Sequence, residues 1–232
     1  MAPGDRALLD SEDTQHLRVL RARIGDILRG TDGCGSEMRL TLLDLSPRGA
    51  EVEARTVGPG TRELTGTLSL ILPSLHTPRA DTVVEKATEM GVRAILVTPT
   101  GRSQTTGLAT RLERWRRIAR AATMQSLGTW IPSIDLVRDL NDALERLQPK
   151  QLLFGDPAGE SLSSVGRGRR ASAAVAVGPE GGLTGDEIAV LERAGGRPIA
   201  LGPRRLRADT AAIVLLAAVA AALAPCEGPA DT

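Results

Sequence analysis

Two turns rich in glycine and proline constrain the fold of this chain more than any other feature of its sequence. The first spans residues 177–184 (VGPEGGLT), and the second spans residues 201–211 (LGPRRLRADTA). Each turn follows a short apolar segment typical of a β-strand and precedes a segment with a helical pattern. Two such turns close in sequence predict two backbone-rich loops at the carboxyl edge of one sheet, where open α/β sheets bind small molecules.

From residue 67 onward the sequence alternates between strand and helix patterns. Strands are expected at residues 68–72, 94–97, 151–154, 173–177 and 199–201, and helices at residues 80–90, 110–126, 184–194 and 209–224. The helix at residues 184–194 has a capping-box pattern from Thr184 to Glu187 and a glycine stop at Gly195. This alternation predicts an α/β fold with a parallel sheet and helices on both faces. Residues 155–172, rich in Gly, Ser and Arg, are predicted to form a flexible loop.

Residues 1–66 follow a different pattern, in which short strands are separated by turns. A helix is expected at residues 14–23, and strands are expected at residues 27–29, 38–45 and 50–57. Short strands at this spacing predict a small β-barrel. The expected organisation is therefore a barrel at residues 1–66, an α/β domain at residues 67–226 and a disordered tail at residues 227–232.

The charge of the chain is almost balanced, with 29 Lys and Arg against 28 Asp and Glu and a net charge of +1. This balance argues neither for nor against a nucleic-acid partner. Only Lys86 and Lys150 are lysines, so 27 of the 29 basic residues are arginines. Arginine suits phosphate and base-edge contacts through its planar fork, but a GC-rich coding bias explains the same excess.

The sequence gives no sign of a metal site, a disulfide or a membrane segment. Cys34 and Cys226 lie far apart without a Cys-x-x-Cys spacing, and His16 and His76 form no metal-binding pattern with them. The N-terminus lacks an apolar signal core, and the apolar stretch at residues 211–224 is too short to span a bilayer. We therefore expect a cytoplasmic protein with no metal and no membrane partner.

The first turn holds three glycines and one proline in the five residues 178–182. Glycine permits positive φ angles and lets a ligand approach the backbone closely. The spacing matches neither the dinucleotide fingerprint GxGxxG nor a P-loop. Taken by itself, the first turn is also explained as a tight strand-to-helix turn that binds no ligand. A site built from the backbone groups of both turns suits an adenine and an amino-acid carboxylate.

The second turn leads into the last helix through Arg207, Asp209 and Thr210. Asp209 or Thr210 is a natural N-cap, which accounts for both of these residues. Arg207 is a cation near the positive end of that helix, so an anionic partner is the better explanation for it. The arginines at residues 113–120 form either a solvated helix face or an RNA-facing stripe, and Gln125 ends the same helix with a polar side chain.

Taken in order, these segments resemble the RsmE family of knotted, SPOUT-class methyltransferases, which methylate N3 of a uridine in small-subunit ribosomal RNA with S-adenosyl-L-methionine. The resemblance covers nearly the whole chain, and the two C-terminal turns carry its most specific motifs. Residues 16–21, 85–92 and 114–126 match further blocks. The resemblance implies a PUA-like RNA-binding barrel, a C-terminal trefoil knot, and a homodimer with sites at the subunit interface. The implied substrate is 16S ribosomal RNA in the assembled 30S subunit.

The resemblance also implies roles for individual residues. Residues expected to bind S-adenosyl-L-methionine are Phe154, Gly178, Pro179, Glu180, Gly181, Gly182, Leu201, Gly202, Leu206, Arg207, Thr210 and Ala211. Residues expected to bind RNA are Arg6, Arg18, Arg21, Arg79, Lys86, Arg102 and Gln125. Arg207 is expected to stabilise negative charge on the base or its phosphate, and Asp209 to orient the base or accept its proton. Glu180 is expected to contact the donor or to order its loop.

Several positions depart from the family pattern. Asp209 stands where the family usually has Glu, Met124 where Glu commonly precedes Gln, and Gly128-Thr129 where an Arg is usual. Residues 76–79 (HTPR) replace a Lys-Gly-acid-Lys pattern, and Arg6 lacks an aromatic neighbour. These departures lie outside the donor loops or at their rim, so they bear on the RNA target more than on donor binding. Two alternatives stay open: a knotted methyltransferase acting on another RNA position, and an RNA-binding module without catalysis.

Overall fold

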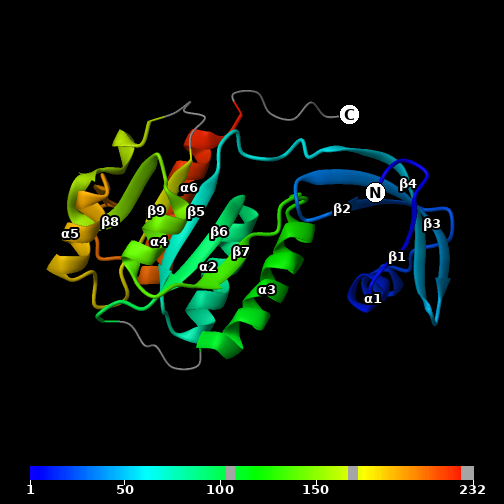
Figure 1. Ribbon diagram of the computed structural model, residues 1–232, viewed down its shortest axis with the longest axis horizontal. Coiled ribbons are helices and arrows are strands. Elements are labelled where there is room, and N and C mark those ends of the chain that lie inside the picture. Colours follow the sequence, from blue (N-terminus) through cyan, green and yellow to red (C-terminus); the bar gives the residue numbers. More distant parts are fainter. Residues whose placement is uncertain (103–107, 167–171, 226–232) are drawn as a thin grey trace. The chain divides into compact units, whose positions relative to one another are not determined.

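The computed structural model describes residues 1–102, 108–166 and 172–225. The chain divides into two compact units, Met1–Arg62 and Glu63–Thr232 (Figure 1). Just after this division, the backbone N–H and Oγ1 of Thr65 both donate to the Leu223 carbonyl oxygen, at 2.9 and 2.7 Å. The division therefore falls a few residues before the boundary expected at residue 66. The tail expected at residues 227–232 lies outside the described residues.

The first unit is a four-stranded antiparallel sheet with one helix. Its elements are β1 (Arg6–Leu8), α1 (Ser11–Val19), β2 (Ile27–Thr31), β3 (Ser36–Ser46) and β4 (Gly49–Pro59), in the strand order β1-β4-β3-β2. The Asp10 side chain caps α1 by accepting a hydrogen bond from the Asp13 backbone N–H at 2.8 Å. This cap places the start of α1 at Ser11, and the helix ends at Val19. Both ends therefore come earlier than in the helix expected at residues 14–23.

The core of the first unit follows the two-residue period of its strands. Every second residue of β3 and β4 is buried against Leu17 of α1; these strand residues are Met38, Leu40, Leu42, Ala50, Val52 and Ala54. The alternation read from the sequence at residues 51–55 is thereby confirmed. The PUA-like character of this unit stays a prediction from the family resemblance.

The second unit is a six-stranded sheet with helices on both faces. Its elements are β5 (Leu68–Pro73), α2 (Thr77–Glu89), β6 (Val92–Thr98), α3 (Leu108–Gln125), β7 (Ser133–Leu136), α4 (Leu140–Leu147), β8 (Gln151–Ser161), the 3₁₀ turn η1 (Leu162–Ser164), β9 (Ala173–Ala176), α5 (Gly185–Arg193), β10 (Arg197–Ala200) and α6 (Ala208–Leu223). The strand order is β10-β8-β9-β5-β6-β7, and each neighbouring pair is parallel. The predicted α/β fold with a parallel sheet is confirmed.

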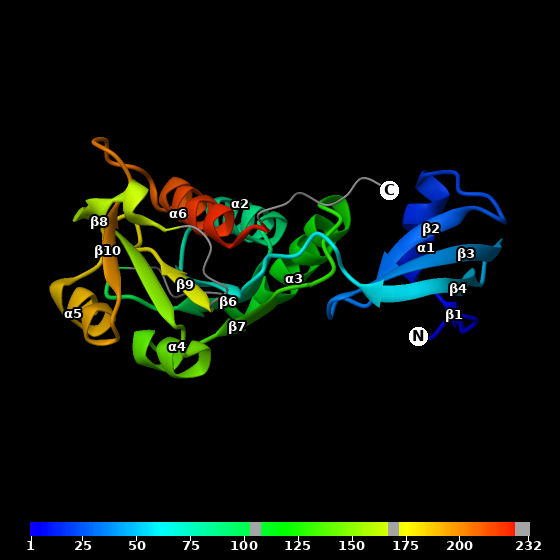
Figure 2. The ribbon, with the colours of Figure 1, turned by 90° about the horizontal axis from the view of Figure 1, so that it is seen from above.

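Two hydrophobic cores hold the layers together, one on each face of the sheet. The first packs α2, α3 and α6 around Val84, Trp115 and Leu215, and the second packs α4 and α5 around Phe154 and Leu191 (Figure 2). All five side chains are fully buried. Burial of one such aliphatic or aromatic side chain stabilises the fold by roughly 1.5–3 kcal/mol, so these cores fix the sheet edge from which the loops emerge.

Strand β8 is longer than the sequence indicated. Residues 155–161, expected in a flexible loop, belong to this strand, so that expectation is wrong here; residues 167–171 lie outside the described residues. A Cβ atom on Gly159 would lie 2.4 Å from the carbonyl carbon of Pro198 in β10. Only glycine permits this approach. This close approach, together with the pairing of Glu160 and Ser161 with β10, accounts for the order of a segment whose composition is typical of loops.

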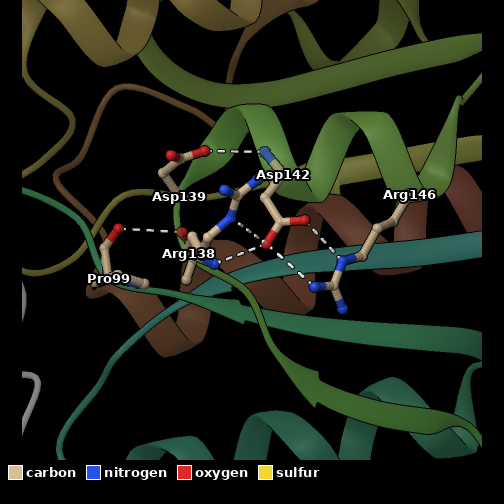
Figure 3. A network of polar contacts seen from close by, with 6 residues as sticks. Pro99, Arg138, Asp139, Asp142 and Arg146 are labelled. Carbon is tan, nitrogen blue, oxygen red and sulfur yellow. Dashed lines mark hydrogen bonds and ion pairs between the residues drawn. The ribbon is translucent and has the colours of Figure 1, made fainter.

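The elements β7 and α4 were not anticipated, and α4 begins with a hydrogen-bond network (Figure 3). The Asp139 side chain accepts a bond from the Asp142 backbone N–H at 2.9 Å. Asp142 accepts in turn from the backbone N–H of Arg138 at 2.9 Å and from Nε of Arg146 at 2.8 Å. The Arg138 N–H first, and then the Arg146 guanidinium, lower the pKa of Asp142 from 3.8 to about 2.

Replacing Asp142 by Asn should lower the melting temperature by several degrees at neutral pH, because the charged acceptor of three donors is lost. The folded-state pKa lies below the unfolded value of 3.8. The stabilisation is therefore complete above that value and is lost as the pH falls toward about 2. Thermal unfolding across this range should show the gap between the wild type and D142N closing. Glu145→Gln, an exposed change on the same helix, is the control, and a D142N gap of constant size would contradict the assignment.

Candidate ligand-binding site

A cleft of about 810 Å³ lies at the carboxyl ends of β8, β9 and β10. Its size is within the range of small-molecule sites, about 300–1,000 Å³. Because β8 lies between β9 and β10 in the sheet, the loop after β9 and the loop after β10 flank the end of β8. The two glycine- and proline-rich turns of the sequence form these two walls.

The wall after β9 is a turn that requires glycine at two positions. A Cβ atom on Gly178 would lie 2.7 Å from the Leu183 backbone nitrogen, which is closer than real contacts allow. Gly182 has a φ of +75° and donates its N–H to the Pro179 carbonyl oxygen at 2.8 Å. The tight-turn explanation therefore holds for this loop, but the same residues also line the cleft.

Three arginines fasten this wall from different elements. Arg79 of α2 pairs with the Glu180 carboxylate at 2.6 Å, and Arg205 donates to the Glu180 carbonyl oxygen at 3.2 Å. Arg102, which follows β6, donates to the Gly181 carbonyl oxygen at 2.6 Å. The Arg79 and Glu180 side chains are each about a third to a half exposed, so solvent screens their attraction. Their main effect is to fix the position of the loop.

The capping box predicted at the start of α5 is confirmed. Thr184 Oγ1 accepts from the Glu187 backbone N–H, and Glu187 Oε2 accepts from the Thr184 N–H at 2.7 Å. The second oxygen of Glu187 accepts from the Gly101 N–H at 2.8 Å. The end of the first wall is thus joined to the segment after β6.

The wall after β10 carries the positive charge of the cleft. Gly202 turns the chain with a φ of +122°, and Arg204, Arg205 and Arg207 line the cleft. Arg207 is the N-cap residue of α6, and its carbonyl oxygen accepts from the Ala211 N–H at 2.8 Å. These guanidinium groups can bind a carboxylate or a phosphate.

The expectation that Asp209 or Thr210 caps α6 is wrong. The extended backbone of Arg207 precedes the first helical residue, Ala208, and no side chain caps this end. Asp209 therefore lies inside the first helical turn. Its Oδ1 atom is buried and has no hydrogen-bond partner among the described residues. Asp209 itself is not one of the residues that line the cleft, although Ala208 and Ala211 of the same helix are.

The structure places most of the expected donor-binding residues on the cleft. Those that line it are Gly178, Pro179, Glu180, Gly182, Leu201, Gly202, Leu206, Arg207 and Ala211. The side chain of Phe154 is instead buried in the second core, Gly181 packs against Arg102, and Thr210 is exposed on α6. Lining residues that the sequence analysis did not select are Gly155, Asp156, Pro157, Val177, Leu183, Ile199, Pro203, Arg204, Arg205 and Ala208.

The residues expected to bind RNA have diverse surroundings. In the first unit, Arg6 lies 3.8 Å from Glu51 and from Glu53, Arg18 donates to the Ser46 carbonyl oxygen, and Arg21 is exposed with a φ of 56°. In the second unit, Arg79 and Arg102 hold the loop after β9, and Gln125 is exposed at the end of α3. Lys86 binds Glu85 and Glu89, whose side chains raise its pKa to about 12.

Part of the arginine stripe on α3 has a structural explanation. Arg114 pairs with Asp81 at 2.8 Å, and the same carboxylate accepts from Trp115 Nε1 at 3.0 Å. Arg116 pairs with Glu113 of its own helix at 2.7 Å. These two arginines therefore satisfy acidic groups within the second unit.

Within residues 1–102, 108–166 and 172–225, no group of three or more His, Cys, Asp or Glu side chains has an arrangement suited to a metal ion. No helix in these ranges is both long and apolar enough to cross a bilayer.

Comparison with known proteins gives a consistent result over most of the chain. Residues 62–220 match the RNA methyltransferase domain family. A Mycobacterium bovis protein named ribosomal RNA small subunit methyltransferase E is 32% identical in an alignment 229 residues long, which covers 93% of this chain and 86% of that protein.

Two solved structures share the whole architecture. A methyltransferase from Legionella pneumophila, in complex with the cofactor S-adenosylmethionine, has a TM-score of 0.83 and 27% identity, with 94% of this chain and 93% of that chain covered. A ribosomal RNA small subunit methyltransferase E from Neisseria gonorrhoeae, bound to S-adenosylmethionine, has the same TM-score and identity, with 94% and 92% covered. The family match spans more than half of the chain, and the Mycobacterium bovis relative is covered over most of its own length, so this chain belongs to the RsmE family of RNA methyltransferases.

Proposed function

We propose that this protein transfers a methyl group from S-adenosyl-L-methionine to N3 of a uridine in 16S ribosomal RNA, with the assembled 30S subunit as substrate. The cleft between the two glycine- and proline-rich loops carries this proposal. It has room for a nucleoside that carries an amino-acid group. It also offers backbone groups of Gly178 and Gly202 together with the guanidinium groups of Arg204 and Arg207. Related proteins with this architecture bind the same donor.

The donor supplies a methyl group on a positively charged sulfur. As N3 attacks, the carbon–sulfur bond breaks with its electron pair staying on sulfur, and the N3 proton leaves to a base or to water. Arg207, at the rim of the cleft, would stabilise the negative charge that develops on the uracil ring. Much of the acceleration would come from positioning the two reactants.

Asp209 is the proposed acceptor for the N3–H group. Its Oδ1 atom is buried without a partner among the described residues, and an unsatisfied buried acceptor is unfavourable. An N–H donor on the bound base would remove that penalty. Asp209 would then orient the base, and it would receive the proton during methyl transfer.

The donor loop gives a direct test of binding. Gly178→Ala would push the backbone of Gly182 and Leu183 away from residue 178 and so open the turn. Titration calorimetry should therefore show at least a roughly tenfold loss of S-adenosylmethionine affinity. Gly185→Ala is the matched control, because a Cβ atom at that first position of α5 meets open space. G185A should bind as the wild type does and be slightly more stable. Wild-type affinity in a folded G178A protein would contradict the role of this turn.

Arg207→Ala should lower the methylation rate by about a hundredfold or more while changing donor affinity only slightly. Arg193→Ala, an exposed change at the end of α5, is the control for loss of one positive charge. The assay uses 30S subunits that lack the modification, naked 16S RNA as a second substrate, and mass spectrometry of the released nucleosides. Unchanged turnover in R207A would remove Arg207 from the mechanism.

The same assay separates the two alternatives from the proposal. N3-methyluridine formed in 30S subunits supports the proposed reaction. A different methylated nucleoside, or methylation of another RNA only, indicates a methyltransferase with another target. Failure of the folded wild-type protein to bind the donor, with or without RNA, indicates an RNA-binding module without catalysis.

The surface of α6 supports a homodimer, which we include in the proposal. This sixteen-residue helix carries one charged residue, Asp209. On the side away from the core, Ala217 and Ala221 are exposed, and Ile213 and Val214 are only partly buried. A helix that is apolar on all sides is usually covered on all sides, and a second copy of the same surface is the common solution.

Ala217→Arg should convert the dimer to a monomer, because it places a charge in the apolar contact. Sedimentation velocity at micromolar concentration measures the change. Ala121→Arg, at an exposed position of α3, should leave the dimer intact. A monomeric wild type, or a dimeric A217R protein, would contradict a dimer through α6.

A further inference from the structure

Strand β8 stops pairing with β10 at the floor of the cleft. Pro198 of β10 pairs with Phe154, but the next residue, Ile199, pairs with Glu160. Residues 155–159 therefore form an excursion that has no partners in β10, and Gly155, Asp156 and Pro157 line the cleft. A strand that paired with β10 along its whole length would not have this excursion.

The excursion is held at both ends. At its start, Phe154 is fully buried, and Gly155 lies near Leu201 and Val177, which belong to the two walls of the cleft. At its end, the Gly159 backbone is pressed against Pro198. Asp156, which follows Gly155, therefore lies on a short segment between a buried residue and a close backbone contact.

Asp156 also has a fixed orientation. Its Oδ1 atom accepts a hydrogen bond from the Ala158 backbone N–H at 2.7 Å, which stabilises the turn and fixes the plane of the carboxylate. No ion pair involves Asp156 among the described residues. The other carboxylate lining the cleft, Glu180, is already paired with Arg79. Asp156 is thus the acidic group of the cleft whose charge is not offset within the described part of the chain.

The chemistry of the donor shows what this carboxylate can bind. The amino-acid end of S-adenosylmethionine carries a carboxylate and an ammonium group on the same carbon atom. Arg204 and Arg205 line the cleft and suit the carboxylate, whereas Arg207 is assigned to the uracil ring. The ammonium group then requires an anionic or carbonyl acceptor beside them. The sulfonium is a poorer partner for Asp156, because its charge disappears during the reaction and pairing it would stabilise the ground state more than the transition state.

We propose that Asp156 binds the α-ammonium group of the methyl donor and so determines specificity for a nucleoside that carries an intact amino acid. This assignment rests on the proposed function, because it names a contact within the same cleft. It makes Asp156 a binding residue for both the donor and the spent product, since both contain the ammonium group.

The test compares Asp156→Asn with the wild type by titration calorimetry against three compounds. S-adenosylmethionine has the ammonium and the sulfonium, S-adenosylhomocysteine has only the ammonium, and 5′-methylthioadenosine has neither. Asn keeps an oxygen to accept from Ala158, so the turn should survive, and thermal unfolding without ligand checks this. Glu192→Gln, an exposed change on α5 outside the cleft, controls for loss of one negative charge.

D156N should weaken binding of the first two compounds by the same factor, roughly ten- to hundredfold, and change the third by less than about twofold. Ratios between compounds within one variant do not depend on the fraction of folded protein. A loss confined to S-adenosylmethionine would assign Asp156 to the sulfonium, and an equal loss for all three would assign it to the adenosine part. Either result, or no loss, overturns the proposal. A wild type that binds none of the three would instead overturn the donor site itself.

Discussion

Close approach of backbones at the carboxyl edge of the sheet is the constraint on which the rest of the second unit depends. Gly159 lies against Pro198, and Gly178 lies against Leu183, at distances that a Cβ atom would not permit. The first contact brings β8 and β10 together just before β8 resumes its pairing with β10. The second folds the loop after β9 back on itself. Without these contacts the two loops would not face each other across one cleft.

The loops are made rigid by arginines whose partners are backbone oxygens or nearby carboxylates. Arg102 and Arg205 donate to the carbonyl oxygens of Gly181 and Glu180, and Arg79 pairs with the Glu180 side chain. A loop fixed before the ligand arrives loses less conformational entropy on binding. Two residues expected to contact RNA, Arg79 and Arg102, are thus found holding the loop after β9. The arginine excess of the chain therefore serves internal structure as well as any partner.

The sequence predicted the features that depend on local patterns. Alternating strands and helices, the capping box at Thr184 and the two turns follow from periodicity and from residue type. The strand order was not predictable, because it depends on which strands pair over long distances, and so Asp156 could not be assigned to the cleft between its two walls. The helix α4 has an apolar stripe, formed by Leu140, Ala143, Leu144 and Leu147 in the second core, and a side-chain cap at Asp139. It was missed although local patterns of this kind could have found it. The start of α6 was misplaced because Arg207 precedes it without a side-chain cap.

The charge distribution bears on how such a protein can select an RNA. A net charge of +1 gives no strong field to attract a polyanion from a distance. Several arginines of the second unit, among them Arg79, Arg114 and Arg116, are engaged with carboxylates. The concentrated positive charge of the cleft is the group Arg204, Arg205 and Arg207, next to the positive end of α6. Selectivity by a protein with so weak a long-range field would rest on the shape of a substrate that brings one nucleotide to this corner, which is the reason that the proposal names the assembled 30S subunit.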